Sequence, residues 1–225
     1  QTTHVRTPDT IDFYADGRTL DAKAIVAKTP ERRIKGTRYL LQIEEIDGVK
    51  PHGLVRADDA RTDIRFHQGD SVHIHGTLSG IEDDEGVLYS RIAAIKGVYA
   101  TLDHGSLQLI SSASSPSVLA FLGNQKLKLE ARISVLFSEP YAALLTGLLT
   151  GSQGRITPTL DDAFSTTGLT HMLAISGFNI TLVLSLVQGA LFFLPKKWRL
   201  VPAGIAVVIF TLFVGASASA VRACI

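Results

Sequence analysis

Gly168-Leu-Thr-His-Met-Leu-Ala-Ile-Ser-Gly-Phe-Asn-Ile-Thr-Leu-Val-Leu-Ser-Leu-Val187 joins a short, mostly apolar run to a longer one that carries no charge before Lys196. The 18 residues from Gly177 to Leu194 would reach roughly 27 Å as a helix, close to the thickness of the hydrocarbon core of a bilayer. Helices kink at Ser-Gly pairs, and broken backbone persists at membrane depth only where protein or water satisfies its polar groups. We therefore expect a helix break at Gly177, followed by a membrane helix that lines a path or cavity.

Charge divides the chain into two unlike halves. Residues 1–110 hold 14 Lys and Arg against 17 Asp and Glu, a net −3, whereas residues 111–225 hold 8 against 4, a net +4. The second half is rich in Leu, Val, Ala and Phe, so a polar domain followed by membrane helices explains the composition better than one globular core. The only cysteine, Cys224, excludes an intramolecular disulfide and a cysteine zinc site.

The polar half shows the alternation of β-strands. Apolar residues occupy every second position over Leu20–Val26 and again over Tyr39–Ile43, which predicts half-buried strands. Asp47-Gly48 is a two-residue hairpin signal. Three further strands are expected at Leu54–Val55, from Gly69 to Leu78, and over Val87–Tyr99 with a bend at Gly97. Five short strands in this length predict an all-β, OB-like barrel.

Beyond a Ser-rich connector at residues 101–117, the apolar spacing becomes helical. The helix that begins at Val118 carries Lys and Arg, so we expect it to lie at the membrane interface rather than to span it. Tyr141–Leu149 is apolar but too short to span, and Thr159 is the expected cap of a short helix. The predicted domains are therefore residues 1–110, the β-domain; 111–138, the connector and interfacial helix; and 139–225, the start of a polytopic helical membrane domain.

A basic loop predicts the topology of that membrane domain. Pro195-Lys-Lys-Trp-Arg199 separates two hydrophobic runs, and three positive charges in a short loop favour the cytoplasmic side. Gly177 and the β-domain would then lie outside. The chain begins without Met and ends just after a hydrophobic segment, so we interpret it as an internal fragment of a longer protein.

The membrane half resembles the ComEC competence proteins, a family of polytopic channels that pass single-stranded DNA into the cell during natural transformation. Gly168–Gly177 resembles the central signature of that family. The similarity covers about residues 139–225 in family order, and further pieces are Gly147–Gly151, Arg155, Pro158, Asp162–Phe164 and Gly215–Ala223. Many members have His where this chain has Asn179, so no imidazole role is transferred to that position.

The resemblance implies a function and a location. It implies uptake of single-stranded DNA through a multi-pass protein of the cytoplasmic membrane, with an extracytoplasmic OB-like domain, membrane lipid around it and other competence-machinery proteins as partners. It implies no chemistry on DNA in this segment, and we expect no enzyme activity, cofactor or metal. The rival interpretation is a membrane-anchored β-domain that binds protein or glycan.

Five residues of the membrane half are candidates for the channel: His171, Ser176, Gly177, Asn179 and Arg222. An ionisable side chain at membrane depth is costly unless paired, so His171 has either a functional or a helix-packing role. Arg222 follows a run of small residues and could meet a DNA phosphate or a lipid headgroup. A hydrolase that uses His171 and Ser176 is disfavoured, because residues five apart on a helix do not face each other.

The β-domain offers a basic loop as the DNA contact. Five of eleven residues are cationic, namely Lys28, Arg32, Arg33, Lys35 and Arg38. The loop between the first two strands of an OB-fold is a usual nucleic-acid contact, and Lys and Arg bind phosphates without reading sequence. A solvated hairpin, or one that meets anionic lipid, is the alternative. The ring of Tyr39 fits the inward phase of its strand and is expected in the core.

Histidines form the last candidate cluster. His73 and His75 share one face of a predicted strand, and His67 is near in sequence. This spacing can bind a metal, but no carboxylate stands at an evident spacing, so two exposed histidines opposite Val72 and Ile74 are the preferred interpretation.

Overall fold

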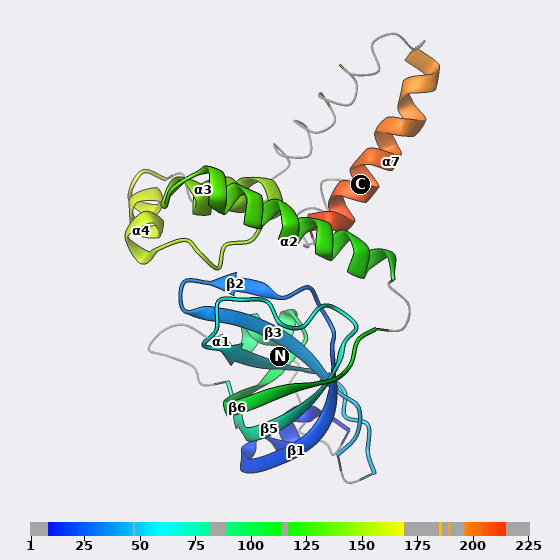
Figure 1. Ribbon diagram of the computed structural model, residues 1–225, viewed down its shortest axis with the longest axis vertical. Coiled ribbons are helices and arrows are strands. Elements are labelled where there is room, and N and C mark those ends of the chain that lie inside the picture. The colour runs from blue at the N-terminus through cyan, green and yellow to red at the C-terminus, as the bar shows by residue number, and fades with distance from the viewer. Residues whose placement is uncertain are drawn as a thin grey trace. The chain divides into compact units, whose positions relative to one another are not determined.

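The computed structural model describes residues 9–46, 48–81, 89–113, 117–168, 185, 189 and 196–214. The chain divides into two compact units, Gln1–Ala120 and Phe121–Ile225. A sheet domain with short helices is followed by a helical unit, so the order of the two predicted parts is confirmed at this level (Figure 1).

Six strands form the sheet of the first unit. They are β1 (Asp16–Val26), β2 (Glu31–Arg33), β3 (Gly36–Ile43), β4 (Leu54–Asp59), β5 (Ser71–Gly80) and β6 (Val98–Ser111). Short helices accompany them, η1 (Ile11–Tyr14) before β1 and α1 (Tyr89–Ile95) before β6. The domain is therefore mixed rather than all-β.

The sheet closes on itself. Its order is β1-β5-β6-β4-β3-β2, and β1 also pairs with β3, so five strands form a ring and β2 is an extra edge on β3. The β4–β6 pair is parallel, while the other neighbouring pairs are antiparallel. A small closed barrel with one parallel pair is consistent with the predicted OB-like architecture.

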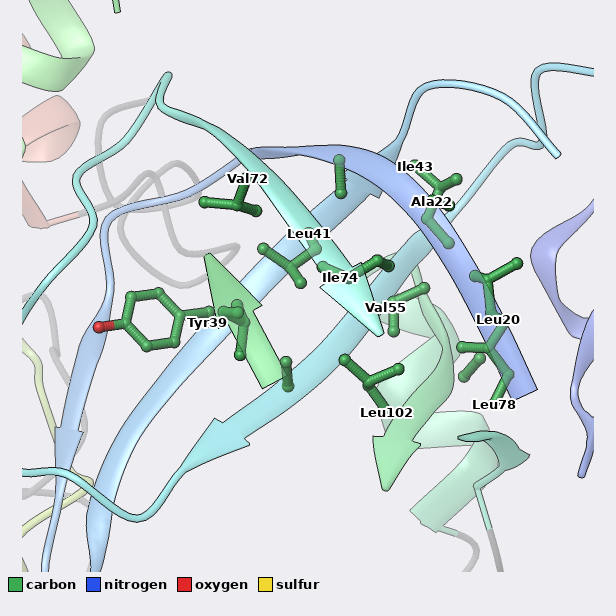
Figure 2. Packing of buried hydrophobic residues seen from close by; sticks show 14 of the residues in the cluster. Leu20, Ala22, Tyr39, Leu41, Ile43, Val55, Val72, Ile74, Leu78 and Leu102 are labelled. Carbon is green, nitrogen blue, oxygen red and sulfur yellow. The ribbon is translucent and has the colours of Figure 1, made fainter. Parts of the chain in front are cut away.

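The barrel interior is filled by the residues that the alternation predicts. Tyr39, Leu41 and Ile43 of β3 are fully buried, and the alternating residues of β1 and β5 meet them in one cluster. Figure 2 shows side chains from different strands converging on that interior. Because successive residues of a strand point to opposite faces, the same register directs the intervening residues of β3 outward.

The predicted hairpin after β3 is confirmed. The backbone N–H of Ile46 donates to Val49 O at 2.8 Å, and that of Val49 donates to Ile46 O at 2.9 Å. Gly48 has a φ of +81°, the left-handed conformation that such a two-residue connection requires.

The prediction was wrong between β5 and the end of the domain. Residues 89–95 of the expected fifth strand form α1, and Gly97 ends that helix with a φ of +76° instead of bending a strand. The last strand, β6, begins at Val98 and runs through Ser111, where a connector was expected. Its alternation is hidden in the sequence because the β5–β6 register shifts between His75 and Thr77, near the left-handed His104.

The second unit contains most of α2 (Val118–Leu136), together with α3 (Tyr141–Thr150), α4 (Pro158–Thr166) and α7 (Lys196–Val214). The helix predicted from Val118 is confirmed, although Leu119 and Leu136 of its expected apolar stripe are exposed. The predicted cap of α4 was two residues late: Thr157 Oγ1 accepts from the N–H of Leu160, and Pro158 occupies the first helical position.

The basic loop before the second hydrophobic run is also different from the prediction. Lys196 to Arg199 form the first turn of α7. Of the helices within the described ranges, none combines the length and the apolar composition needed to cross a membrane. The predicted span from Gly177 to Leu194 lies almost entirely outside the described residues.

Candidate nucleic-acid interface

The predicted basic loop folds as a short hairpin. Glu31–Arg33 pair with Gly36–Arg38, and Ile34 and Lys35 form the exposed turn. Gly36 has a φ of +105°, and a Cβ built on it would lie 2.0 Å from Asp59 O, so only glycine lets the hairpin lie against the end of β4. The hairpin is therefore held to β4 rather than extending freely into solvent.

The hairpin divides the five predicted cations between different positions. Lys35 is at the turn and Lys28 is exposed before β2, with its Nζ 3.5 Å from Lys96 O. Arg33 and Arg38 follow the outward phase of their strands, whereas Arg32 has the opposite phase, opposite Thr37. The five cations of the predicted basic loop are thus not equivalent: Lys35 is at the turn, and Arg33 and Arg38 are on the outward face of the strands.

Arg38 is paired on that outward face. Its Nε and Nη2 donate to the two carboxylate oxygens of Asp58 on β4 at 2.7 and 2.8 Å. Arg38 and Asp58 are direct partners in the β3–β4 register. Such a bidentate pair is stronger than a single charge-assisted hydrogen bond, so Arg38 is less available to a ligand than the sequence suggests.

A further arginine, absent from the predicted set, joins this face. Arg56 of β4 lies opposite Leu40, and its Nε is 3.9 Å from Asp58 Oδ2. Burial lowers the pKa of Arg56, and the neighbouring charges of Arg38 and Arg33 lower it further. The positive charges of Arg33 and Arg38 thus act on Arg56. We call these three residues the arginine face.

Asp58 is the carboxylate that these arginines share. Partial burial would raise the pKa of its side chain, but the hydrogen bond from Arg38 and the charges of Arg38, Arg56 and Arg33 lower it below its ordinary value. Glu31 pairs with Arg33 at 3.2 Å. Three acids therefore act on the three arginines, since the charge of Asp103 also acts on Arg56, and the exposed Lys35 is close by in the chain.

Several guanidinium donors on the hairpin and the arginine face have no hydrogen-bond partner. The Nε atoms of Arg32, Arg33 and Arg56 are buried without a hydrogen bond, in a described chain where few side-chain atoms share this condition. Buried donors left unpaired cost free energy, which a side-chain movement that brings them to an anionic ligand would recover. Phosphate is a fitting acceptor for such arginines, because its oxygens match the guanidinium fork.

Tyr39 lies in the core, as predicted. Burial raises the pKa of its phenol, its oxygen accepts from the N–H of Arg65 at 3.2 Å, and its ring packs edge-on against Phe66. It is thus excluded as a stacking platform for bases.

The histidines are exposed or half-exposed, as predicted, but they have a carboxylate partner that sequence spacing did not reveal. Asp21 on β1 lies 2.8 Å from His73 Nε2 and 3.3 Å from His75 Nδ1. The contact depends on the β1–β5 register, in which Asp21 is opposite His75. In the described part of the chain, no group of three or more His, Cys, Asp or Glu side chains is arranged to hold a metal ion.

The helical unit holds a polar network built on residues of the resemblance. The buried carboxylate of Glu130 on α2 accepts from Thr150 Oγ1 at 2.8 Å and from Ser152 Oγ at 2.6 Å. Arg155 donates to Ser134 Oγ and to Glu139 Oε1. These bonds tie the segment after α3 to α2, so Thr150 and Arg155 have a structural role in the described chain.

The predicted channel residues His171, Ser176, Gly177, Asn179 and Arg222 lie outside the described residues. Their predicted roles, including the helix break at Gly177 and the disfavoured hydrolase, remain predictions.

Comparison with known families gives a match in the C-terminal part of the chain. Residues 148–225 match the family model of the competence proteins. No curated protein matches the chain. The match begins beside the polar network and includes the signature at Gly168–Gly177. The resemblance noted in the sequence is thus confirmed, and residues 148–225 of this chain match the competence protein family.

Proposed function

We propose that this chain is part of a channel that passes single-stranded DNA across the cytoplasmic membrane during natural transformation. The family match over residues 148–225 carries this proposal, because it supports a role in competence. The β-barrel, which we assign as an OB-fold, would hold the incoming strand on the outer side of the membrane. The helical unit would contribute to the path through it.

The arginine face and the hairpin turn supply the means of binding. The domain from residue 1 to 110 has a net charge of −3, so attraction for DNA must come from a local patch and not from the overall field. The side chains of Arg33 and Arg56 are about one-third exposed, which supports a phosphate ligand on this side of the barrel. Lys and Arg contacts to phosphate do not read sequence, which suits a channel that accepts any strand.

Exposed apolar side chains support a membrane location for the helical unit. Val201, Ile205, Val208 and Ile209 occupy one face of α7 and are exposed in the described chain. Lipid or further helices of the same protein would cover such a face. We propose a multi-pass protein with the first turn of α7 on the cytoplasmic side and the barrel outside.

An experiment that varies the charge of the nucleic-acid backbone distinguishes DNA binding from protein or glycan binding. The purified full chain should bind an oligothymidylate and fail to bind a peptide nucleic acid of the same bases, because the latter has no phosphates. Equal binding of both, or of neither, would refute DNA binding by phosphate contacts. We also propose that this segment does no chemistry, and an active-site serine probe that labels Ser176 would contradict that.

A further inference from the structure

Arg38 holds the carboxylate of Asp58 with a pair of hydrogen bonds, the geometry that arginine also uses to bind phosphate. Two of its oxygens receive the Nε and Nη2 donors of Arg38 at 2.7 and 2.8 Å, and Arg56 Nε approaches one of them at 3.9 Å. Arginine binds carboxylate and phosphate with the same two-pronged fork. The guanidinium groups of β3 and β4 are thus arranged around an anion that belongs to the chain itself.

The pairing around Asp58 is unequal. Arg38 is fully engaged, whereas Arg56 reaches the same carboxylate only at ion-pair distance and keeps an unpartnered Nε. The carboxylate of Asp58 is oriented toward the fork of Arg38, and in this arrangement it makes no hydrogen bond with Arg56 Nε. The pair of Arg18 and Asp16 on β1 is different, because there one arginine meets one carboxylate, at 2.9 Å.

We propose that Asp58 is a built-in competitor for the DNA phosphate, so that its carboxylate and a phosphate of the strand exchange at Arg38 and Arg56. The inference rests on the proposed DNA-binding function and adds a residue that weakens binding. When a phosphate approaches, Arg56 engages it first, because Arg56 Nε meets Asp58 only at ion-pair distance, whereas two hydrogen bonds hold Arg38. Arg38 follows only if its bond to Asp58 is given up.

The competitor has a purpose in a channel. A site on a translocation path must bind its cargo strongly enough to admit it and weakly enough to release it. An internal carboxylate limits the lifetime of each phosphate contact, because it restores the Arg38 pair when the strand moves on. The barrel therefore holds single-stranded DNA transiently.

The test is the removal of the carboxylate charge without a change of shape. In the purified full chain, Asp58→Asn should bind a fluorescent oligothymidylate more tightly than the parent, and its log affinity should depend more steeply on log salt. One additional phosphate contact makes the slope of log affinity against log salt steeper by about 0.7. The affinity ratio of the variant to the parent should therefore be roughly five times larger at about 0.1 M salt than at about 1 M. Asp58→Glu keeps the charge and should show no gain.

Matched variants separate the competitor from a general charge effect. Asp16→Asn removes the same charge beside Arg18 and should leave affinity unchanged. Adding Arg56→Gln to Asp58→Asn should remove most of the gain. Asp58→Ser provides a second uncharged side chain should the asparagine variant fail to fold.

The outcomes distinguish two failures. If the parent binds DNA but Asp58→Asn and Asp58→Ser bind no more tightly than Asp16→Asn, the competitor role is wrong and the proposed function stands. If the parent and all variants fail to bind at low salt, the DNA-binding role of the barrel fails, and the competitor role fails with it.

Discussion

Arg38 and Asp58 face each other across β3 and β4, and two hydrogen bonds of 2.7 and 2.8 Å join the guanidinium to the carboxylate. The sequence alone places Arg38 among the five cations expected to contact DNA and gives no sign of Asp58 as its partner. The strand register settles the pairing. The five predicted cations are therefore unequal, and a sixth, Arg56, belongs with them.

The Arg38–Asp58 pair predicts an acid-sensitive contribution to stability. Because the pKa of Asp58 is lowered in the folded protein, its stabilising effect is present above the unfolded pKa, about 3.9 for Asp, and is lost as pH falls through the folded pKa. The free energy of unfolding of the parent should exceed that of Asp58→Asn at neutral pH, and the two should converge in strong acid. Denaturant titrations from pH 7 to 2 measure this. A difference that stays constant or widens with acid would contradict the assignment.

Gly36 should be indispensable to the hairpin. Gly36→Ala places a Cβ 2.0 Å from Asp59 O at a φ of +105°, so we expect a loss of stability beyond the roughly 1–3 kcal/mol of backbone strain alone. Gly17→Ala is the control, because its φ of +85° is also left-handed but no atom lies within 4 Å of the new Cβ. Thermal unfolding compares them, and equal losses would show that the contact with β4 does not matter.

The hydroxyl of Thr150 should stabilise the helical unit through Glu130. Thr150→Val keeps the shape of the side chain and removes a donor to a buried carboxylate, with an expected cost of about 1–3 kcal/mol. Thr166→Val is the matched change, because the hydroxyls of Thr150 and Thr166 both donate to the carbonyl four residues earlier in their helices, but that of Thr166 is exposed. Chemical denaturation of the full chain should separate the two variants, and indistinguishable losses would remove Glu130 as the anchor of the segment after α3.

Topology should follow the charges at the start of α7. In a background where Cys224, the only cysteine, is replaced by Ser, a membrane-impermeant thiol reagent applied to intact cells should label Asp84→Cys and leave Lys197→Cys unlabelled. Permeabilised cells should expose both positions and so show that each cysteine can react. The reverse pattern would end the proposed orientation and separate the barrel from incoming DNA.

Local pattern accounts for the parts of the fold that could be predicted. Alternating apolar residues identify β1 and β3, and Asp47-Gly48 identifies the hairpin, because each signal depends on neighbours in the chain. The fifth strand was misplaced because helix α1 and a register shift opposite β5 interrupt the alternation. Neither feature has a signature within a few residues.

The candidate site likewise contains residues that the sequence predicts and residues that only strand pairing brings together. Clustering of cations in the sequence finds Arg33 and Arg38, but Arg56 and Asp58 come from a strand about twenty residues away and meet them only through the β3–β4 register. Asp21 reaches His73 and His75 in the same way, across β1 and β5. Partners that depend on strand pairing are invisible to spacing along the chain.

Salt dependence of single-strand binding tests the central claim most directly. If about three cations of the hairpin and arginine face meet phosphates, log affinity of the full chain for an oligothymidylate should fall against log salt with a slope near −2, and Arg33→Ala with Arg56→Ala should flatten it by roughly 1.4. Arg61→Ala with Arg65→Ala is the control of equal charge and should change the slope much less. Undetectable binding at low salt, or an Arg33 and Arg56 double variant with the parent's slope, would contradict the account.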